Sequence, residues 1–175
     1  MPNELPDTKP ATELIDGYPV QKIGGALRHQ ALEFRWVMAL RTWCGECGEA
    51  IHECRHEFRA EGHPFASLVP DVAYLSRQAL EELGPAASES PPRAPEIAVE
   101  ILSAGESERY LTWKIGAYLA AGTRVVFVVD PPNRTVIAHS RDGVERFGPG
   151  DTVRHAAMPG FSYDVDVMFE GLYLG

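Results

Sequence analysis

The 175-residue chain is 45% hydrophobic and 23% charged, a balance that suffices for one packed core and is too apolar for a disordered protein. Its 16 Lys and Arg residues against 25 Asp and Glu give a formal net charge of −9, which excludes a broadly basic surface for nucleic acid. Residues 1–10 contain no apolar run, and the longest such run, over 125–129, is far too short to cross a bilayer. Because the three cysteines cannot all pair with one another, we expect a soluble, cytoplasmic protein with reduced thiols and no membrane partner.

The hydrophobic pattern predicts one α/β or α+β domain over residues 12–175, preceded by a flexible arm over residues 1–11. After the arm, the expected elements are, in chain order, two strands turning at Asp16-Gly17 (13–20), a helix (28–44), a strand or hairpin (48–59), a β-rich segment (67–75), a loop (81–95), a strand (96–102), a helix (103–121), a buried central strand (125–129) and a hairpin (135–147). This order predicts a mixed sheet flanked by helices, with additional β-hairpins.

Both predicted helices have an apolar face. In the first helix this face holds Leu32, Trp36, Ala39 and Trp43, and His29 lies on the same side. In the second helix, Ser103 and Glu106 fit a capping box at the start, and Gly122 follows the end. The apolar stripe of the second helix is Leu111, Ile115, Tyr118 and Leu119.

Two acidic residues lie on different predicted strands. Asp71 follows Pro70, and Glu100 lies on the face of its strand opposite Val99 and Ile101. If the two strands are neighbours, both carboxylates converge on one side of the sheet, where burial requires a cation or a proton. Such oxygen-rich sites suit Mg²⁺ or Mn²⁺. The alternative is that Glu100 lies on a solvated face and Asp71 caps a turn.

Lys114 is the third residue of interest. It lies about 60° from Leu111 on the second helix, at the edge of the apolar stripe. From there a long side chain can follow the apolar face and bring its ammonium group to the end of the sheet. Beside two carboxylates it could orient a water or stabilise charge on phosphorus. The alternative is an ordinary surface lysine.

Six segments in a fixed order carry a family resemblance. They are Glu13-Leu14-Ile15-Asp16-Gly17, His29-Gln30, Val69-Pro70-Asp71-Val72-Ala73, Val99-Glu100-Ile101-Leu102-Ser103, Lys114-x-x-x-Tyr118-Leu119-Ala120-Ala121-Gly122 and Phe127-Val128-Val129-Asp130-Pro131. Over roughly residues 12–170 they resemble the widespread bacterial "putative restriction endonuclease" family, a branch of the PD-(D/E)xK nuclease superfamily.

The resemblance implies a restriction-endonuclease-like core and hydrolysis of DNA phosphodiester bonds that depends on Mg²⁺ or Mn²⁺. Asp71 and Glu100 match the metal-binding acids of the family. The superfamily lysine, normally two residues after the glutamate, is replaced by Leu102, and Lys114 matches a lysine moved to the next helix. Nucleases of this fold commonly pair to cut two strands, so the resemblance also implies a homodimer. It further assigns a site-shaping role to Glu13, His29 and Glu96.

Two positions depart from the family pattern. Ala104 stands where a proline is common, and Tyr110 stands where an aspartate usually precedes the helix lysine by four residues. These departures and the acidity of the chain favour an alternative function, a nuclease-fold binding module that is weakened or inactive in catalysis.

A cysteine cluster offers a third hypothesis, a thiol-based metal or redox sensor. Cys44 and Cys47 are spaced as C-x-x-C, and Cys54 follows. Structural zinc sites usually join two knuckles separated by roughly 12–20 residues, but only six residues separate Cys47 from Cys54. We therefore predict no zinc site there.

Overall fold

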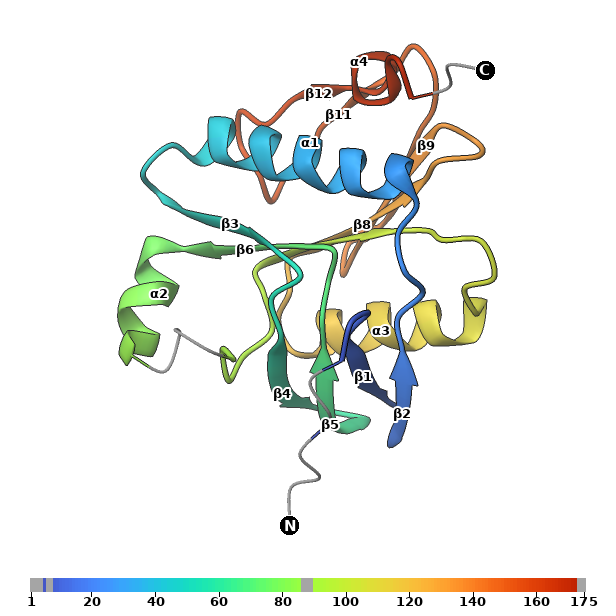
Figure 1. Cartoon of the computed structure of the whole chain (residues 1–175). Helices are drawn as coiled ribbons and strands as arrows, with labels where there is room; N and C mark the ends of the chain where they lie inside the picture. Colours follow the sequence, from blue (N-terminus) through green and yellow to red (C-terminus); the bar gives the residue numbers. More distant parts are fainter. Residues whose placement is uncertain (1–4, 6–7, 86–89, 173–175) are drawn as a thin grey trace.

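The computed structural model describes residues 5, 8–85 and 90–172 (Figure 1). The helices are α1 (Leu27–Cys44), α2 (Arg77–Leu83), α3 (Glu108–Ala120) and α4 (Val165–Phe169). The strands are β1 (Thr12–Ile15), β2 (Tyr18–Gln21), β3 (Gly48–His52), β4 (His56–Ala60), β5 (His63–Leu68), β6 (Val72–Ser76), β7 (Ile97–Ile101), β8 (Val125–Asp130), β9 (Thr135–Ser140), β10 (Gly143–Phe147), β11 (Thr152–Val153) and β12 (Tyr163–Asp164). Residues 1–4 and 6–7 of the predicted arm lie outside the described residues.

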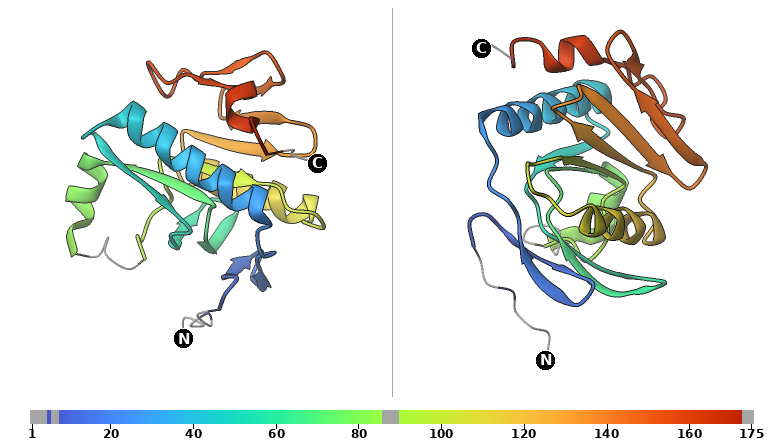
Figure 2. Two further views of the ribbon diagram at one scale, coloured as in Figure 1. Left: turned by 45° about the horizontal axis from the view of Figure 1, so that its top comes forward. Right: turned by 90° about the vertical axis from the view of Figure 1, so that its right-hand side faces the viewer.

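A six-stranded sheet in the order β10-β9-β8-β7-β6-β3 forms the centre of the fold. β7 and β8 run parallel and are joined through α3, whereas their other neighbours in this sheet are antiparallel. Figures 1 and 2 show α1 on one face of the sheet and α3 on the other. The sequence prediction of a mixed sheet flanked by helices is therefore confirmed.

Two hydrophobic cores follow from this layering. Below α1, side chains such as Leu32, Trp36 and Leu40 pack against Val99 and Ile101 of β7. Between α3 and the sheet, Ala117 and Tyr118 pack against the opposite face of the same strands. Because successive residues of a strand point to opposite faces, Glu100 of β7 lies on the α3 side.

A smaller sheet in the order β2-β1-β5-β4 lies against α3. Its first hairpin turns at Asp16 and Gly17, which have φ angles of 52° and 79°, as the Asp-Gly dipeptide predicts. β1 carries Glu13 beneath α3, so this sheet contributes one wall of the site described below.

Several predicted boundaries were wrong. Residues 77–83 form α2, with Ser76 accepting a hydrogen bond from the amide of Ala79, although the loop was predicted to begin at Glu81. The second predicted helix begins at Glu108, so the contact between the Ser103 amide and Glu106 precedes the helix. β3 and β4 lie in different sheets and do not form a hairpin.

The buried face of α3 also differs from its predicted stripe. Its buried residues are Lys114, Ala117 and Tyr118, whereas Leu111, Ile115 and Leu119 are only partly buried. The helix therefore buries a charged residue and a hydroxyl against the sheet, and both need polar partners.

Within the described residues, no helix has the length and hydropathy needed to cross a bilayer.

His56 is expected to make stability depend on pH. Burial lowers its pKa to about 4, and its Nδ1 lies 2.9 Å from the Arg93 carbonyl oxygen. An unfolded-state pKa near 6.5 means that the unfolded chain binds the extra proton first as the pH falls. The free energy of unfolding therefore loses about 3 kcal/mol between pH 7 and pH 4 through this residue.

Denaturant unfolding between pH 7 and pH 4 measures this effect. His56→Gln is expected to have a shallower pH dependence than the wild type, and replacement of exposed His52 by Gln is the matched control. Equal slopes for wild type and His56→Gln would show that His56 does not carry the effect.

Candidate active site

The register of two neighbouring strands brings Asp71 and Glu100 together. β6 pairs antiparallel with β7 through Val72 and Val99, so Asp71, one residue before β6, lies beside Glu100. The amide of Ile101 donates a hydrogen bond of 2.6 Å to Asp71 Oδ2. Both carboxylates are 2% exposed, so neither lies on a solvated face.

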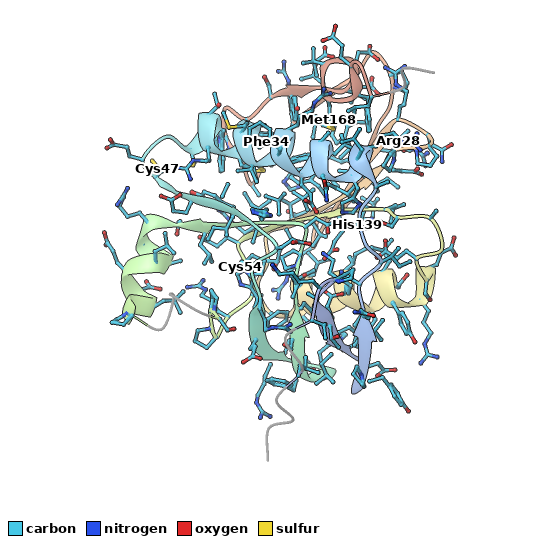
Figure 3. All side chains as sticks on the ribbon, in the orientation of Figure 1. Arg28, Phe34, Cys47, Cys54, His139 and Met168 are labelled. Atoms are coloured by element: carbon cyan, nitrogen blue, oxygen red, sulfur yellow. The ribbon has the colours of Figure 1, made fainter. Side chains whose placement is uncertain are left out.

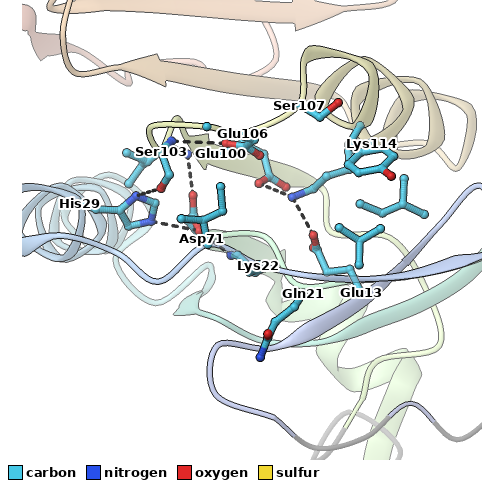
Figure 4. A pocket seen from close by; sticks show the side chains of 16 residues that line it. Glu13, Gln21, Lys22, His29, Asp71, Glu100, Ser103, Glu106, Ser107 and Lys114 are labelled. Carbon is cyan, nitrogen blue, oxygen red and sulfur yellow. Dashed lines mark hydrogen bonds and ion pairs between the residues drawn. The ribbon is translucent and has the colours of Figure 1, made fainter.

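Lys114 reaches Glu100 and Glu13 from α3 (Figure 4). Its Nζ lies 2.6 Å from Glu100 Oε2 and 3.2 Å from Glu13 Oε2. Tyr118, one helical turn further on, donates a 3.0 Å hydrogen bond to Glu100 Oε1. Lys114 is itself only 2% exposed, so it is not an ordinary surface lysine.

Asp71 has its own cationic partners. Lys22 Nζ lies 2.5 Å from Asp71 Oδ1 and donates a second hydrogen bond to the Val69 carbonyl. His29 Nε2 lies 3.3 Å from the same Asp71 oxygen. Lys22 was missed by the sequence analysis, because it follows β2 and meets Asp71 only through a contact 49 residues apart.

Burial and charge give the two acids different pKa values. Burial raises the pKa of Glu100 to about 7, and the charges of Asp71 and Glu13 add to this against the opposing effect of Lys114. Burial also opposes ionisation of Asp71, but Lys22 and His29 hold its pKa well below the usual range. Carboxylates with pKa values moved in opposite directions are typical of active sites.

Lys114 and His29 both remain charged in this environment. Burial disfavours the Lys114 ammonium, but Glu100 and Glu13 raise its pKa above the ordinary value. Burial also lowers the pKa of His29, but its hydrogen bonds with Asp71 and Glu33 outweigh that effect and raise the pKa to about 9. The site therefore combines buried negative and positive groups whose charges largely compensate.

Five of the sequence-predicted site residues line one cavity of about 240 Å³. They are Glu13, His29, Asp71, Glu100 and Lys114. Glu96 is not brought to this cavity, because it lies four residues before Glu100, about 13 Å along the strand. Its Oε2 instead accepts a hydrogen bond of 2.5 Å from the Ser76 amide, so a site-shaping role for Glu96 has no support here.

The cysteines lie away from the cavity. Cys44 is buried at the end of α1, Cys47 is exposed nearby, and Cys54 is half-buried between β3 and β4 (Figure 3). Among residues 5, 8–85 and 90–172, the group of three ligand atoms close enough for a metal is formed by His29, Glu33 and Asp71, without a cysteine.

The donor set of the cavity fits a divalent cation. Glu13, Asp71 and Glu100 supply carboxylate oxygens, which are the ligands that Mg²⁺ and Mn²⁺ prefer. Buried carboxylates that face one another need a compensating cation, and the ammonium groups of Lys22 and Lys114 supply that charge in this structure.

The hydroxyl of Tyr118 is expected to stabilise this arrangement. Tyr118→Phe removes the hydrogen bond to buried Glu100 and is expected to lower the free energy of unfolding by about 1–3 kcal/mol. Denaturant unfolding measures the loss, and Tyr18→Phe on the exposed face of β2 is the matched control. A loss no larger than that of the control would show that the Tyr118 hydroxyl contributes little.

The mixed sheet flanked by helices, together with the structural match given below, assigns the chain a restriction-endonuclease-like fold. A family described as "Putative restriction endonuclease" (Uma2) matches residues 3–167, and the chain belongs to this family. No curated protein matches the chain.

A solved structure supports the same classification. The chain is similar to the crystal structure of a "putative nuclease belonging to DUF820" from Anabaena variabilis ATCC 29413. The two share 26% sequence identity and a TM-score of 0.83, and the match covers 95% of this chain and 93% of the other. The similarity therefore extends over almost the whole of both chains.

Proposed function

We propose that this protein is a divalent-metal-dependent endonuclease that hydrolyses phosphodiester bonds of DNA. The observation that carries the proposal is the convergence of the buried side chains of Asp71, Glu100 and Lys114 at one cavity. Membership of a nuclease family and the similarity to the Anabaena protein support the same activity. The cytoplasm, where DNA is accessible and thiols stay reduced, is the proposed location.

Asp71 and Glu100 would hold the cation, either Mg²⁺ or Mn²⁺. When bound, such a cation lowers the pKa of a water and offsets charge on a phosphate. Lys114 holds its proton and lies against Glu100, so it can orient a water or stabilise negative charge on the scissile phosphate. Glu13 fixes the Lys114 ammonium from the opposite side.

Local charge makes DNA contact compatible with an acidic chain. The formal net charge of −9 repels phosphate over the molecule as a whole. At the cavity, however, Lys22, His29 and Lys114 lie beside the acids. We therefore expect weak binding to DNA that decreases further at high salt.

Cleavage assays test the proposal directly. Supercoiled, linear duplex and single-stranded DNA are incubated with the purified protein in Mg²⁺, in Mn²⁺ and in a chelator. We expect metal-dependent cleavage that is lost in Asp71→Ala and in Lys114→Ala. Cleavage no greater than that of these folded variants, with either metal and every DNA form, would contradict the proposal.

A second candidate function is a binding module without catalysis. Tyr110, which replaces the usual aspartate of the family, lines the cavity close to Lys114 and favours this alternative. Calorimetry combined with the cleavage assay distinguishes the two functions, since the module binds metal or DNA without cutting.

Homodimer formation also remains a prediction, and analytical ultracentrifugation of the full chain tests it.

A further inference from the structure

A second cavity adjoins the first and is lined by Asp71 but not by Glu100. This cavity lies against α1 and has a volume of about 700 Å³. Its lining includes His29, Glu33 and Asp71 together with Lys22. Glu33 has no part in the nuclease site proposed above, and its side chain is 13% exposed.

Three ligand atoms meet at this cavity. His29 Nε2 lies 3.1 Å from Glu33 Oε1 and 3.3 Å from Asp71 Oδ1. All three atoms lie within 4.8 Å of one another. Ligands about 2.1 Å from a metal are separated by roughly 3.0–3.4 Å in octahedral or tetrahedral arrangements, so both observed distances match neighbouring ligands of one ion.

We propose that His29, Glu33 and Asp71 bind a transition-metal dication such as Mn²⁺ or Zn²⁺. This position is distinct from the Asp71–Glu100 pair, although it shares Asp71 with the proposed nuclease site. One imidazole nitrogen and two carboxylates form a mixed ligand set that suits these ions, whereas Mg²⁺ prefers oxygen ligands alone. Glu33 follows His29 by one helical turn, which places both side chains on the same face of α1.

The His29 ring is held in the orientation that a ligand needs. Its Nδ1 lies 3.2 Å from Ser103 Oγ, so Nε2 is the nitrogen that faces the carboxylates. Metal-binding histidines commonly use their second nitrogen in this way. Gly25 packs against the ring so closely that a Cβ there would lie 2.9 Å from His29 Cδ2.

A cation already occupies part of the position. The Lys22 ammonium group lies 2.5 Å from Asp71 Oδ1, the same oxygen that His29 approaches. A metal ion must therefore displace Lys22, whose side chain is 11% exposed and borders the cavity. It must also displace the proton that charged His29 carries on Nε2, which is released to solvent.

Metal titration of the full chain tests the proposal. Isothermal calorimetry measures Mn²⁺ and Mg²⁺ affinity, and the electron paramagnetic resonance spectrum of Mn²⁺ reports its ligands. We expect the wild type to bind Mn²⁺ at least tenfold more tightly than Mg²⁺. Glu33→Gln and His29→Gln should each lower the Mn²⁺ affinity at least tenfold and reduce the preference for Mn²⁺. Glu49→Gln, at an exposed glutamate paired with Arg41, is the matched control and should bind as the wild type.

Comparison with Glu100→Gln separates this proposal from the nuclease proposal. Wild-type Mn²⁺ affinity in folded Glu33→Gln and His29→Gln, with loss in Glu100→Gln, would overturn the additional site and leave the nuclease proposal intact. It would also identify His29 as an imidazolium that only pairs with the two carboxylates. If Glu33→Gln binds Mn²⁺ more weakly than the wild type while the wild type cuts no DNA, the additional site is supported and the nuclease function is contradicted.

Discussion

Replacement of Lys114 by Met is expected to lower the free energy of unfolding by about 3–5 kcal/mol. The change removes the cation that lies 2.6 Å from Glu100 and 3.2 Å from Glu13, and leaves both carboxylates buried without it. Met preserves most of the volume and the apolar contacts of the stem, so the loss reports charge rather than a cavity. Urea unfolding at neutral pH measures the change.

Matched variants isolate the electrostatic part of this loss. Lys9→Met removes an exposed lysine and is expected to leave the stability within about 0.5 kcal/mol of the wild type. The double variant with Glu100→Gln and Lys114→Met is expected to be more stable than the sum of the two single changes predicts, by about 0.5–3 kcal/mol. Strict additivity would show that Glu100 and Lys114 do not depend on each other for stability.

The fold followed from local patterns, because its elements are strongly periodic. The buried run over 125–129 became the central strand β8, and the Asp16-Gly17 dipeptide became the turn of the first hairpin. The start of α3 was misplaced because Ser103 and Glu106 form only half of a capping box, the hydrogen bond from the Ser103 amide to Glu106, and the helix begins five residues after Ser103. A side-chain contact with the backbone three residues away therefore did not determine where that helix starts.

Parts of the site followed from the sequence for different reasons. Strand alternation placed Glu100 on the correct face, and the antiparallel register brought Asp71 beside it. The same alternation put Glu96 on that face, but distance along the strand keeps it from the cavity. Lys22 was missed, since a period of two or 3.6 describes a single element and Lys22 meets Asp71 across elements. Glu33 was also missed, although it lies one helical turn after His29 on α1 and helical spacing could have identified it.

Replacement of Asp71 by Asn is expected to reduce the proposed DNA cleavage by roughly 10³-fold or more. Asn retains an oxygen that can accept the hydrogen bond from the Ile101 amide, so the local backbone is preserved. It removes the negative charge that would hold a cation and that faces both Lys22 and His29. Single-turnover cleavage rates in Mn²⁺, compared with Asp142→Asn in an exposed turn, measure the effect.

A second readout needs neither metal nor DNA. Asp71 and Glu33 raise the pKa of His29 to about 9, against the effect of burial. With Asp71→Asn only Glu33 remains, so the pKa of His29 is expected to fall toward its ordinary value near 6.5. Nuclear magnetic resonance titration of the imidazole in metal-free protein measures this shift. If cleavage is lost while the His29 titration stays as in the wild type, Asp71 does not interact with His29 in solution, and the geometry around Oδ1 is contradicted.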